Sequence, residues 1–309
     1  MHRKNKAVSV FFFVLLFPYI LIHSLCRFTY EKLTAPKVIR DVLAKERTRE
    51  FRYELAIVAI AKNEALYVRE WIKYHLVASE GSVHFFLYDN DSEDGLEDVI
   101  RDFIDNGVVT YIPYPGNKMQ LPAYDDAIAK YSGEARYMAF IDLDEFITSR
   151  QDVSITKQIR DLIEKNNACG LGLNWCLYGS SGEKKKRDGL LIERFQRHGT
   201  TGFWGNEHVK SIVNPRMVKR MISCHYPLYY AGGWNINTKG KRQHLWINKP
   251  VDWDILYISH FFCKSEEEFI KKKSRGFADR NGGYDMSNFN LYDVNDVSDD
   301  ILLRYVNRM

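Results

Sequence analysis

The sequence has few cysteines and no excess of charge of one sign. Its five cysteines (Cys26, Cys169, Cys176, Cys224 and Cys263) include no CxxC pair, so neither a zinc knuckle nor a disulfide framework is indicated. We expect reduced thiols, although the spacing of Cys169 and Cys176 would permit one bridge. The 44 basic and 40 acidic residues give a net charge of +4. This value is too close to neutral for a protein whose main partner is nucleic acid.

Other absences narrow the class of protein further. The sequence contains no GxxxxGK[ST] loop and no GxGxxG motif, which argues against the commoner phosphoryl-transfer and dinucleotide-binding folds. It also lacks internal repeats and low-complexity linkers. The 309 residues are 45% hydrophobic and 27% charged, as in ordinary globular proteins, so disorder, collagen and coiled coil are poor interpretations.

A long uncharged segment lies near the amino terminus. Residues 7–26 carry no Asp, Glu, Lys or Arg, and a helix of 20 residues is long enough to cross about 30 Å of hydrocarbon. We therefore expect a cytoplasmic tail and single-pass membrane anchor in residues 1–27, followed by a helical stalk over 28–52. A cleaved signal peptide is one alternative, but no A-x-A-like site follows the apolar run. A buried core helix is the other.

From residue 53 onward, strand and helix patterns alternate. Strands are expected over 53–61, 83–88, 108–112 and 137–141, and helices over 65–78, 96–106 and 124–131. This order predicts an α/β fold with a mainly parallel sheet flanked by helices. Beyond residue 152 the pattern changes: the expected helices are 155–166, 266–273 and 301–305, and the strand-like segments are 170–175, 190–195, 208–213 and 255–258. We expect a single domain over 53–309.

The clearest chemical signal is the segment Phe140-Ile141-Asp142-Leu143-Asp144. An apolar strand leads into a loop with two aspartates, and because side chains alternate along an extended chain, Asp142 and Asp144 can point the same way. Two hard oxygen ligands suit Mg²⁺ or Mn²⁺, which would neutralise a diphosphate leaving group. The alternative is a surface turn whose acids cap a strand, because a DxD pattern is common by chance.

Polar clusters also follow the first two expected strands. Asn63 and Glu64 follow strand 53–61, and Asp89 and Asn90 follow strand 83–88. Ligands of open α/β sheets bind at the carboxyl ends of the strands, where these side chains could hold a ribose hydroxyl or a uracil N–H. Ordinary turn chemistry explains the same residues equally well.

Seven motifs occur in a fixed order over roughly residues 54–280. They are AIVAIAKNEALYVREWIKYHL, FFLYDNDSEDG, YMAFIDLDEFI, LNWCLYGSSG, LIERF, VKSIVNP and ISHFFCKSEEEFIKKKSRG. Together they resemble the family 92 glycosyltransferases and, more distantly, the family 2 glycosyltransferase-like proteins. The resemblance implies a GT-A fold, a divalent cation, a nucleotide-sugar donor such as UDP-galactose or another UDP-hexose, and inversion at the anomeric carbon. It also implies a donor half at about 53–152 and an acceptor half at about 153–309.

The resemblance also suggests roles for particular residues. Asp142 and Asp144 match the metal-binding DxD pair, and Asn63, Glu64 and Asp89 match nucleotide-facing positions. His260 matches the family's late histidine, and a neutral imidazole is a sound ligand for Mn²⁺. A core histidine satisfied by a backbone carbonyl is the alternative for His260. His225 is the competing candidate for the metal.

An inverting transferase needs a general base near the acceptor hydroxyl. Glu207 lies near Trp204, whose ring could stack on a sugar. Glu193 matches the family motif better, but its neighbour Arg194 suggests a structural ion pair. These two glutamates are our candidates, and the sequence does not separate them.

Further candidates have weaker support. Asp125 and Asp126 are alternative bases. Lys210 and Lys264 could contact the diphosphate, because lysine binds phosphate as a point charge.

The sequence therefore predicts a membrane-bound, metal-dependent, inverting hexosyltransferase that acts on a glycan or glycolipid acceptor in the synthesis of a surface polysaccharide, such as lipopolysaccharide or capsule. We expect it at the cytoplasmic face of a bacterial inner membrane, with the Golgi lumen as the alternative. Two other functions stay open. One is a non-catalytic glycan-binding protein on a transferase-like fold, and the other is a different nucleotide-diphosphate-dependent transferase.

Overall fold

The computed structural model describes residues 37–276 and 282–309, which belong to two compact units. The described part of the smaller unit consists of residues 37–49 and 231–233, with a helix over 37–47 that lies within the expected stalk. The expected anchor over 7–26 lies outside the described residues. Within the described ranges, no helix is both long enough and apolar enough to span a bilayer.

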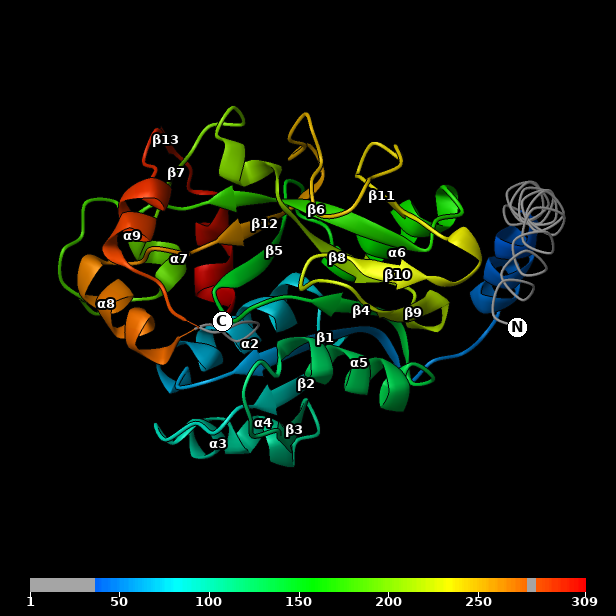
Figure 1. The fold of residues 1–309 in the computed structure, drawn as a ribbon, viewed down its shortest axis with the longest axis horizontal. Coiled ribbons are helices and arrows are strands. Elements are labelled where there is room, and N and C mark those ends of the chain that lie inside the picture. Colours follow the sequence, from blue (N-terminus) through cyan, green and yellow to red (C-terminus); the bar gives the residue numbers. More distant parts are fainter. Residues whose placement is uncertain (1–36, 277–281) are drawn as a thin grey trace, which may run out of the picture. The chain divides into compact units, whose positions relative to one another are not determined.

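The larger unit, residues 50–230 and 234–309, is built around a mixed sheet (Figure 1). The strands follow the order β3-β2-β1-β4-β8-β6-β12-β5, and β11 pairs with β6. Their bounds are β1 (Tyr53–Ala61), β2 (Val83–Asp89), β3 (Val109–Pro113), β4 (Ala135–Phe140), β5 (Glu145–Ser149), β6 (Gly170–Leu177), β8 (Val209–Val213), β11 (Asn235–Ile236) and β12 (Leu256–His260). Strands β1 to β4 pair in parallel, as predicted, whereas β8 runs antiparallel to β4 and β6, and β5 runs antiparallel to β12.

Helices and short segments surround this sheet. The helices are α2 (Ala65–Ala78), α3 (Leu96–Val99), α4 (Arg101–Asp105), α5 (Gln120–Tyr131), α6 (Ile155–Lys165), α7 (Leu191–Arg194), α8 (Glu266–Arg275) and α9 (Met286–Tyr292). The 3₁₀ segments are η1 (Trp204–Glu207), η2 (Pro215–Met217), η3 (Tyr230–Gly232) and η4 (Ile301–Arg308). Two short ladders lie outside the main sheet: β9 (Val218–Met221) with β10 (Pro227–Tyr229), and β7 (Arg197–His198) with β13 (Val297–Ser298).

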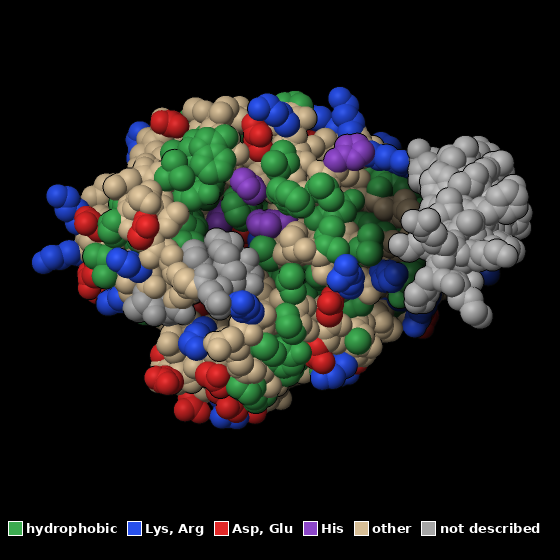
Figure 2. Space-filling model, in the orientation of Figure 1, with side chains coloured by type: hydrophobic (Ala, Val, Ile, Leu, Met, Phe, Trp, Pro, Cys, Tyr) green, Lys and Arg blue, Asp and Glu red, His purple; other side chains and the backbone are tan. Residues whose placement is uncertain are grey.

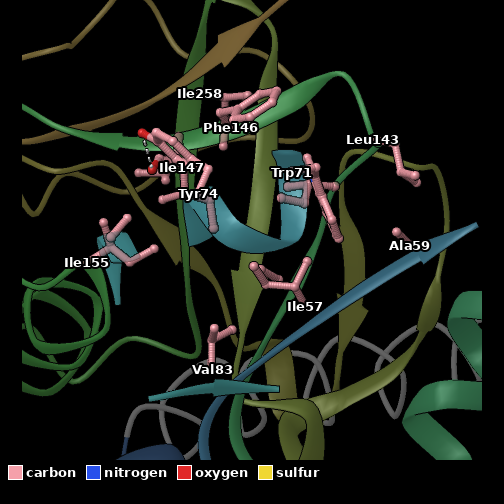
Figure 3. Close-up of a cluster of buried hydrophobic side chains, with 14 of the residues drawn as sticks. Ile57, Ala59, Trp71, Tyr74, Val83, Leu143, Phe146, Ile147, Ile155 and Ile258 are labelled. Carbon is pink, nitrogen blue, oxygen red and sulfur yellow. Dashed lines mark hydrogen bonds between the residues drawn. The ribbon is translucent and has the colours of Figure 1, made fainter. Parts of the chain in front are cut away.

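Strands β1 and β2 are buried on both faces. Because side chains alternate along a strand, neighbouring residues of β2 pack against opposite layers. Phe85 lies 5.3 Å from the Trp71 ring of α2, whereas Phe86 stacks at 4.0 Å on Tyr131 of α5. Figure 3 shows Trp71 in the α2 layer, above Ile57 of β1. Helices α2 and α5 therefore cover opposite faces, and the apolar run of β1 is explained by this double burial.

Helix α2 also holds β5 in place. Trp71 Nε1 donates a hydrogen bond of 2.8 Å to the carbonyl of Glu145. His75 donates through Nδ1 to the carbonyl of Trp71 at 2.8 Å and accepts from the Ile147 amide through Nε2 at 3.1 Å. Tyr74 lies against the same strand, beside Ile147 and Phe146 (Figure 3). These bonds fix the strand that begins one residue after Asp144.

Most expected elements are confirmed, but the expected helix over 96–106 is divided into α3 and α4, and the expected helix over 301–305 lies in the 3₁₀ segment η4. The segment 190–195 is not a strand but contains the helical turn α7, whose Leu191 and Ile192 amides donate to the buried carboxylate of Glu70. Strand β5 was not expected, because the acidic residues of the DxD segment suggested a loop there. Cys169 and Cys176 are separate buried thiols, so the bridge that their spacing would permit does not form.

Candidate functional site

A cavity of about 420 Å³ lies where the carboxyl ends of β1, β4, β6 and β12 meet. Figure 2 shows it as a hollow in which histidine side chains gather, with hydrophobic side chains around them. Its lining includes Ala61, Lys62, Glu64, Asn90, Lys118, Gln120, Asp142, Asp144, Trp175, His208, His225, His260, Phe262, Lys272, Tyr284 and Tyr292. All of these residues belong to the larger unit. The structure therefore brings Asp142, Asp144 and His260 to one cavity, as the sequence predicted.

Asp142 is held by three side-chain donors, of which Tyr124 OH, 3.4 Å from Oδ1, is the most distant. Its Oδ1 accepts from Gln120 Nε2 at 2.8 Å, and its Oδ2 accepts from Lys210 Nζ at 2.8 Å. Its backbone amide donates to Glu145 Oε2 at 2.8 Å. The Asp142 side chain keeps 35% of its surface exposed, so its carboxylate is fixed in place while part of it still faces the cavity.

Asp144 is more deeply buried and has different neighbours. Its Oδ2 accepts from Lys272 Nζ at 2.7 Å, and its Oδ1 lies 3.6 Å from His260 Nε2. Burial alone would raise the pKa of Asp144, but the charge of Lys272 and the contact with His260 hold that pKa well below its usual range. Asp144 is therefore a carboxylate anion at neutral pH.

A buried ion pair lies beside the two aspartates. Lys210 and Glu145 are both buried, with Nζ and Oε2 3.3 Å apart. Burial raises the pKa of Glu145 to about 8, although Lys210 opposes the shift. Burial would lower the pKa of Lys210, but Asp142 and Glu145 raise it well above its usual value. Lys210 does not line the cavity, so the structure places it as a partner of the carboxylates rather than where we expected a diphosphate ligand.

His260 lies between two carboxylates. Its Nε2 faces Asp144, while its Nδ1 is 3.9 Å from Glu145 Oε1. This Nδ1 and this Oε1 are both buried without a hydrogen bond to any described residue. Burial lowers the pKa of His260, which favours the neutral imidazole that binds metals. A metal-binding histidine commonly directs its second ring nitrogen toward a carboxylate, so this orientation fits a metal ligand.

A complete protein cage for a metal is not formed. Among residues 37–276 and 282–309, no three His, Cys, Asp or Glu side chains are gathered closely enough to hold an ion by themselves. The donor set is therefore two carboxylates and one imidazole that line the same cavity. Such a set fits an ion that also takes oxygen ligands from a phosphate group, as Mg²⁺ commonly does.

Three lysines supply positive charge around the cavity, namely Lys62, Lys118 and Lys272. Lys272 Nζ lies 4.1 Å from the centre of the Phe262 ring, in addition to its contact with Asp144. The sequence analysis did not identify Lys272, because a run of lysines on a helix is expected to face solvent. The predicted Lys264 does not line the cavity, and its Nζ lies 3.7 Å from the centre of the Tyr67 ring.

The predicted nucleotide-facing residues divide into two groups. Glu64 and Asn90 line the cavity. Asn90 Nδ2 donates to the carbonyls of Tyr114 at 3.0 Å and Gly116 at 2.8 Å, which holds the segment after β3 at the cavity edge. These two residues therefore lie at the strand ends that line the cavity.

Asn63 and Asp89 instead hold the turn that follows β2. Asn63 Oδ1 accepts from the Glu93 amide at 2.8 Å. Asp89 accepts from Tyr111 OH at 2.6 Å and from the Ser92 amide at 3.2 Å. Neither side chain lines the cavity, and these contacts are those of the turn chemistry that was the alternative interpretation.

The carboxylates considered as general bases lie outside the cavity lining. Glu207 Oε1 pairs with Lys249 Nζ at 2.6 Å, and Glu193 Oε2 accepts from the Leu190 amide at 3.1 Å, where it caps α7. Asp125 and Asp126 bond elsewhere, to the Met221 amide and to Tyr88 OH. The structure does not bring any of these four carboxylates to the two cavity aspartates.

An aromatic wall forms the other side of the cavity. Trp175 is its centre, with ring centroids 4.5 Å from His260, 5.2 Å from His208 and 5.2 Å from His225. Trp204, 45% exposed, lies 6.1 Å from His208. Of this wall, sequence reasoning named Trp204, His225 and His260 but not Trp175 or His208. His208 directly follows the candidate base Glu207, and this position in the sequence could have identified it.

Two solved structures match this chain distantly. Staphylococcus aureus TarS, residues 1–349, matches with a TM-score of 0.36 and 12% identity over 53% of this chain and 47% of TarS. The mannosyltransferase PcManGT from Pyrobaculum calidifontis, in complex with GDP-Man and Mn²⁺, also has a TM-score of 0.36 and 12% identity, over 65% of this chain and 55% of that one. These scores are too low to support a conclusion.

Comparison of sequences is more informative. A glycosyltransferase family 92 protein of Ricinus communis is 27% identical over 261 residues, which cover 83% of this chain and 43% of the relative. One from Oryza sativa subsp. japonica is 28% identical over 174 residues, 54% of this chain and 28% of the relative. The chain thus spans less than half the length of these curated relatives. The family 92 model itself matches residues 56–274, most of the chain, which confirms the resemblance of the ordered motifs: the chain belongs to glycosyltransferase family 92.

Proposed function

We propose that this chain is a metal-dependent, inverting glycosyltransferase of GT-A type that moves a hexose from a nucleotide sugar to a hydroxyl of a glycan or glycolipid. Galactose, carried by UDP, is the first candidate for the hexose. Membership of family 92 supports the class of reaction. The observation that carries the proposal is that Asp142 and Asp144 line one cavity at the carboxyl ends of the strands, where open α/β sheets bind their ligands.

Asp142, Asp144 and His260 would hold a Mn²⁺ or Mg²⁺ ion. When bound, such an ion supplies positive charge that stabilises the departing diphosphate. Asp142 is fixed by Gln120 and Lys210, so its carboxylate does not have to reorganise when the donor binds.

The other cavity residues would bind the donor. Lys62, Lys118 and Lys272 place positive charge where a diphosphate would lie. Asn90 and Glu64 line the part nearest β1 and β2, where the nucleoside would lie. Trp175 offers an apolar ring to a sugar in the cavity, and the exposed Trp204, outside the cavity lining, offers a second ring beside it.

Membrane attachment through residues 7–26 is part of the proposal, as is a role in the synthesis of a surface polysaccharide. The length and lack of charge of the segment support it. Fractionation of the full chain, followed by protease protection of intact vesicles, would decide the point. A bacterial enzyme at the cytoplasmic face would be cleaved from the cytoplasmic side, whereas a Golgi enzyme with a lumenal domain would be protected.

The test of function is release of nucleoside diphosphate from a panel of nucleotide sugars, with and without glycan acceptors, in the presence of Mn²⁺. Transfer of one hexose with release of its nucleoside diphosphate supports the proposal. Glycan binding without any release would instead identify a non-catalytic glycan-binding protein. Transfer of a group other than a sugar would identify a different transferase.

A further inference from the structure

We propose that His208 is the general base that removes the proton from the acceptor hydroxyl. The inference rests on the proposed function and assigns the general base, for which the candidate carboxylates lie outside the cavity lining. His208 follows η1, begins the segment that leads into β8, and lines the cavity that contains Asp142 and Asp144.

The backbone fixes the tautomer of His208. Its Nδ1 lies 3.2 Å from the carbonyl oxygen of Gly205. A carbonyl can only accept, so Nδ1 must carry the hydrogen, and in the neutral ring Nε2 then carries the lone pair. Within the described part of the chain, the side-chain hydrogen bond of His208 is the one through Nδ1, and Nε2 makes none. The ring therefore presents a proton acceptor, which is the state that a general base needs.

Aromatic rings hold His208 in one orientation. It stacks on Trp175 with an interplanar angle of 24°, and Trp204 lies against it on a second side. His260, beside Asp144, contacts the same Trp175 indole. His208 and His260 thus contact the same indole, and both line the cavity. A base of an inverting enzyme must lie on the opposite side of the sugar from the leaving diphosphate, so the proposal requires the acceptor to bind on the His208 side of the donor sugar.

The other histidine of the wall is a poorer base. His225 donates through Nδ1 to the Val209 carbonyl at 2.9 Å, and burial lowers its pKa to about 3. His208, by contrast, keeps contact with solvent. The titratable and charged groups around it include His225, 5.9 Å away between ring centres, and Glu207, its neighbour in the sequence, which pairs with Lys249.

The carboxylates that line the cavity are assigned to metal binding or nucleoside binding. Asp142 and Asp144 are ion-paired with Lys210 and Lys272 and belong to the metal-binding side. Glu64 lies at the end of β1, where the nucleoside is proposed to bind. Among the described cavity residues, His208 thus combines a free lone pair with a position beside the aromatic wall.

The proposed step balances as a single displacement. The acceptor oxygen forms a bond to the anomeric carbon as the bond from that carbon to the diphosphate oxygen breaks. The nucleoside diphosphate leaves with the electron pair of that bond. The acceptor proton passes to Nε2 of His208, which becomes imidazolium and later releases the proton to solvent.

The experiment compares His208→Ala and His208→Asn with the wild type in the full chain. Both variants should lower kcat for transfer to the glycan acceptor by about 10²- to 10⁴-fold, the range for loss of a general base. The KM for the nucleotide sugar should not change. Added imidazole should restore part of the transfer rate in His208→Ala, a rescue that a merely structural role would not give. His208→Asn keeps a side-chain donor for the Gly205 carbonyl, so it tests the lone pair separately from the fold.

His244→Ala is the matched control, because His244 is exposed, lies outside the cavity lining and should keep the wild-type rate. Full transfer by both His208 variants would overturn the inference and leave the proposed function standing. A rate lost without imidazole rescue, together with a raised donor KM, would also overturn it. If the wild type transfers no sugar from any donor, the proposed function itself fails.

Discussion

Lys210 Nζ donates a 2.8 Å hydrogen bond to Asp142 Oδ2 while its side chain is 1% exposed. The lysine comes from β8, the antiparallel strand next to β4, and its ammonium also lies 3.3 Å from Glu145. A fully buried ammonium is stable only when carboxylates neutralise it. The orientation of Asp142 therefore depends on a lysine that is buried in the core of the sheet.

This coupling predicts the effect of Lys210→Met. Removing the ammonium leaves the Asp142 carboxylate without its cation. Breaking a fully buried pair typically costs about 3–5 kcal/mol, but Asp142 is 35% exposed and Glu145 holds a proton near neutral pH, so the cost here should be about 1–3 kcal/mol. We expect the free energy of unfolding, measured with urea, to fall by that amount. Lys219→Met on neighbouring β9 is the control, because Lys219 is exposed and should change stability by less than about 0.5 kcal/mol. Equal stability of the two variants would show that the pair has no structural role.

A second prediction concerns His260 and the metal. If His260 Nε2 is a ligand beside Asp144, His260→Ala should raise the Mn²⁺ concentration for half-maximal activity by about 10- to 100-fold, the range seen when a ligand environment is lost. Removal of metal with EDTA should abolish transfer in the wild type, and Mn²⁺ should restore it. A metal titration that is unchanged in His260→Ala would remove this histidine from the site.

The buried His75 predicts how stability depends on pH. Burial lowers the pKa of His75 to about 3, whereas an unfolded histidine titrates near 6.5. Below pH 6.5 the unfolded chain therefore binds a proton that the folded chain does not. The contribution of His75 to the free energy of unfolding is complete above pH 6.5 and falls by up to about 1.4 kcal/mol per pH unit toward pH 3.

Denaturant unfolding between pH 7.5 and 5 measures this effect. Burial also raises the pKa of Glu145 to about 8, so this residue makes the folded chain more stable as the pH falls, opposite to the effect of His75. The effect of His75 must therefore be measured as the difference between wild type and variant. His75→Asn should be less stable at pH 7.5 and should show a shallower decline at low pH. The exposed His244→Asn should follow the wild-type slope. Parallel curves for wild type and His75→Asn would contradict the predicted proton linkage.

The first part of the sheet could be predicted because its signals are local. The apolar run of β1 and the helical periodicity of α2 gave bounds that the structure reproduces, Tyr53–Ala61 and Ala65–Ala78. Strand β5 could not be predicted in the same way, because it exists through contacts distant in sequence: Trp71 and His75 bond to it from α2, and β12 pairs with it. Likewise α7 depends on Glu70, far away along the chain.

The site shows the same division between local and distant signals. Asp142 and Asp144 were visible because an apolar strand precedes them directly. The burial of Lys210 could not be predicted, since this lysine of β8 is buried beside Asp142 and Glu145, which lie far away in the sequence. His208 was hidden for a similar reason: its chemistry depends on the Gly205 carbonyl and on Trp175 of another strand.

The most direct test of the account measures nucleoside diphosphate release and sugar transfer by wild type, Asp142→Asn and Asp144→Asn, with Mn²⁺ present and with EDTA. The exposed Asp161→Asn on α6 is the control. We predict that the wild type and the control transfer a hexose with Mn²⁺ and not with EDTA, and that each cavity variant loses at least about 10²-fold in kcat while staying folded. Full turnover by either cavity variant, or by the wild type in EDTA, would contradict the central claim that these two aspartates act through a bound cation.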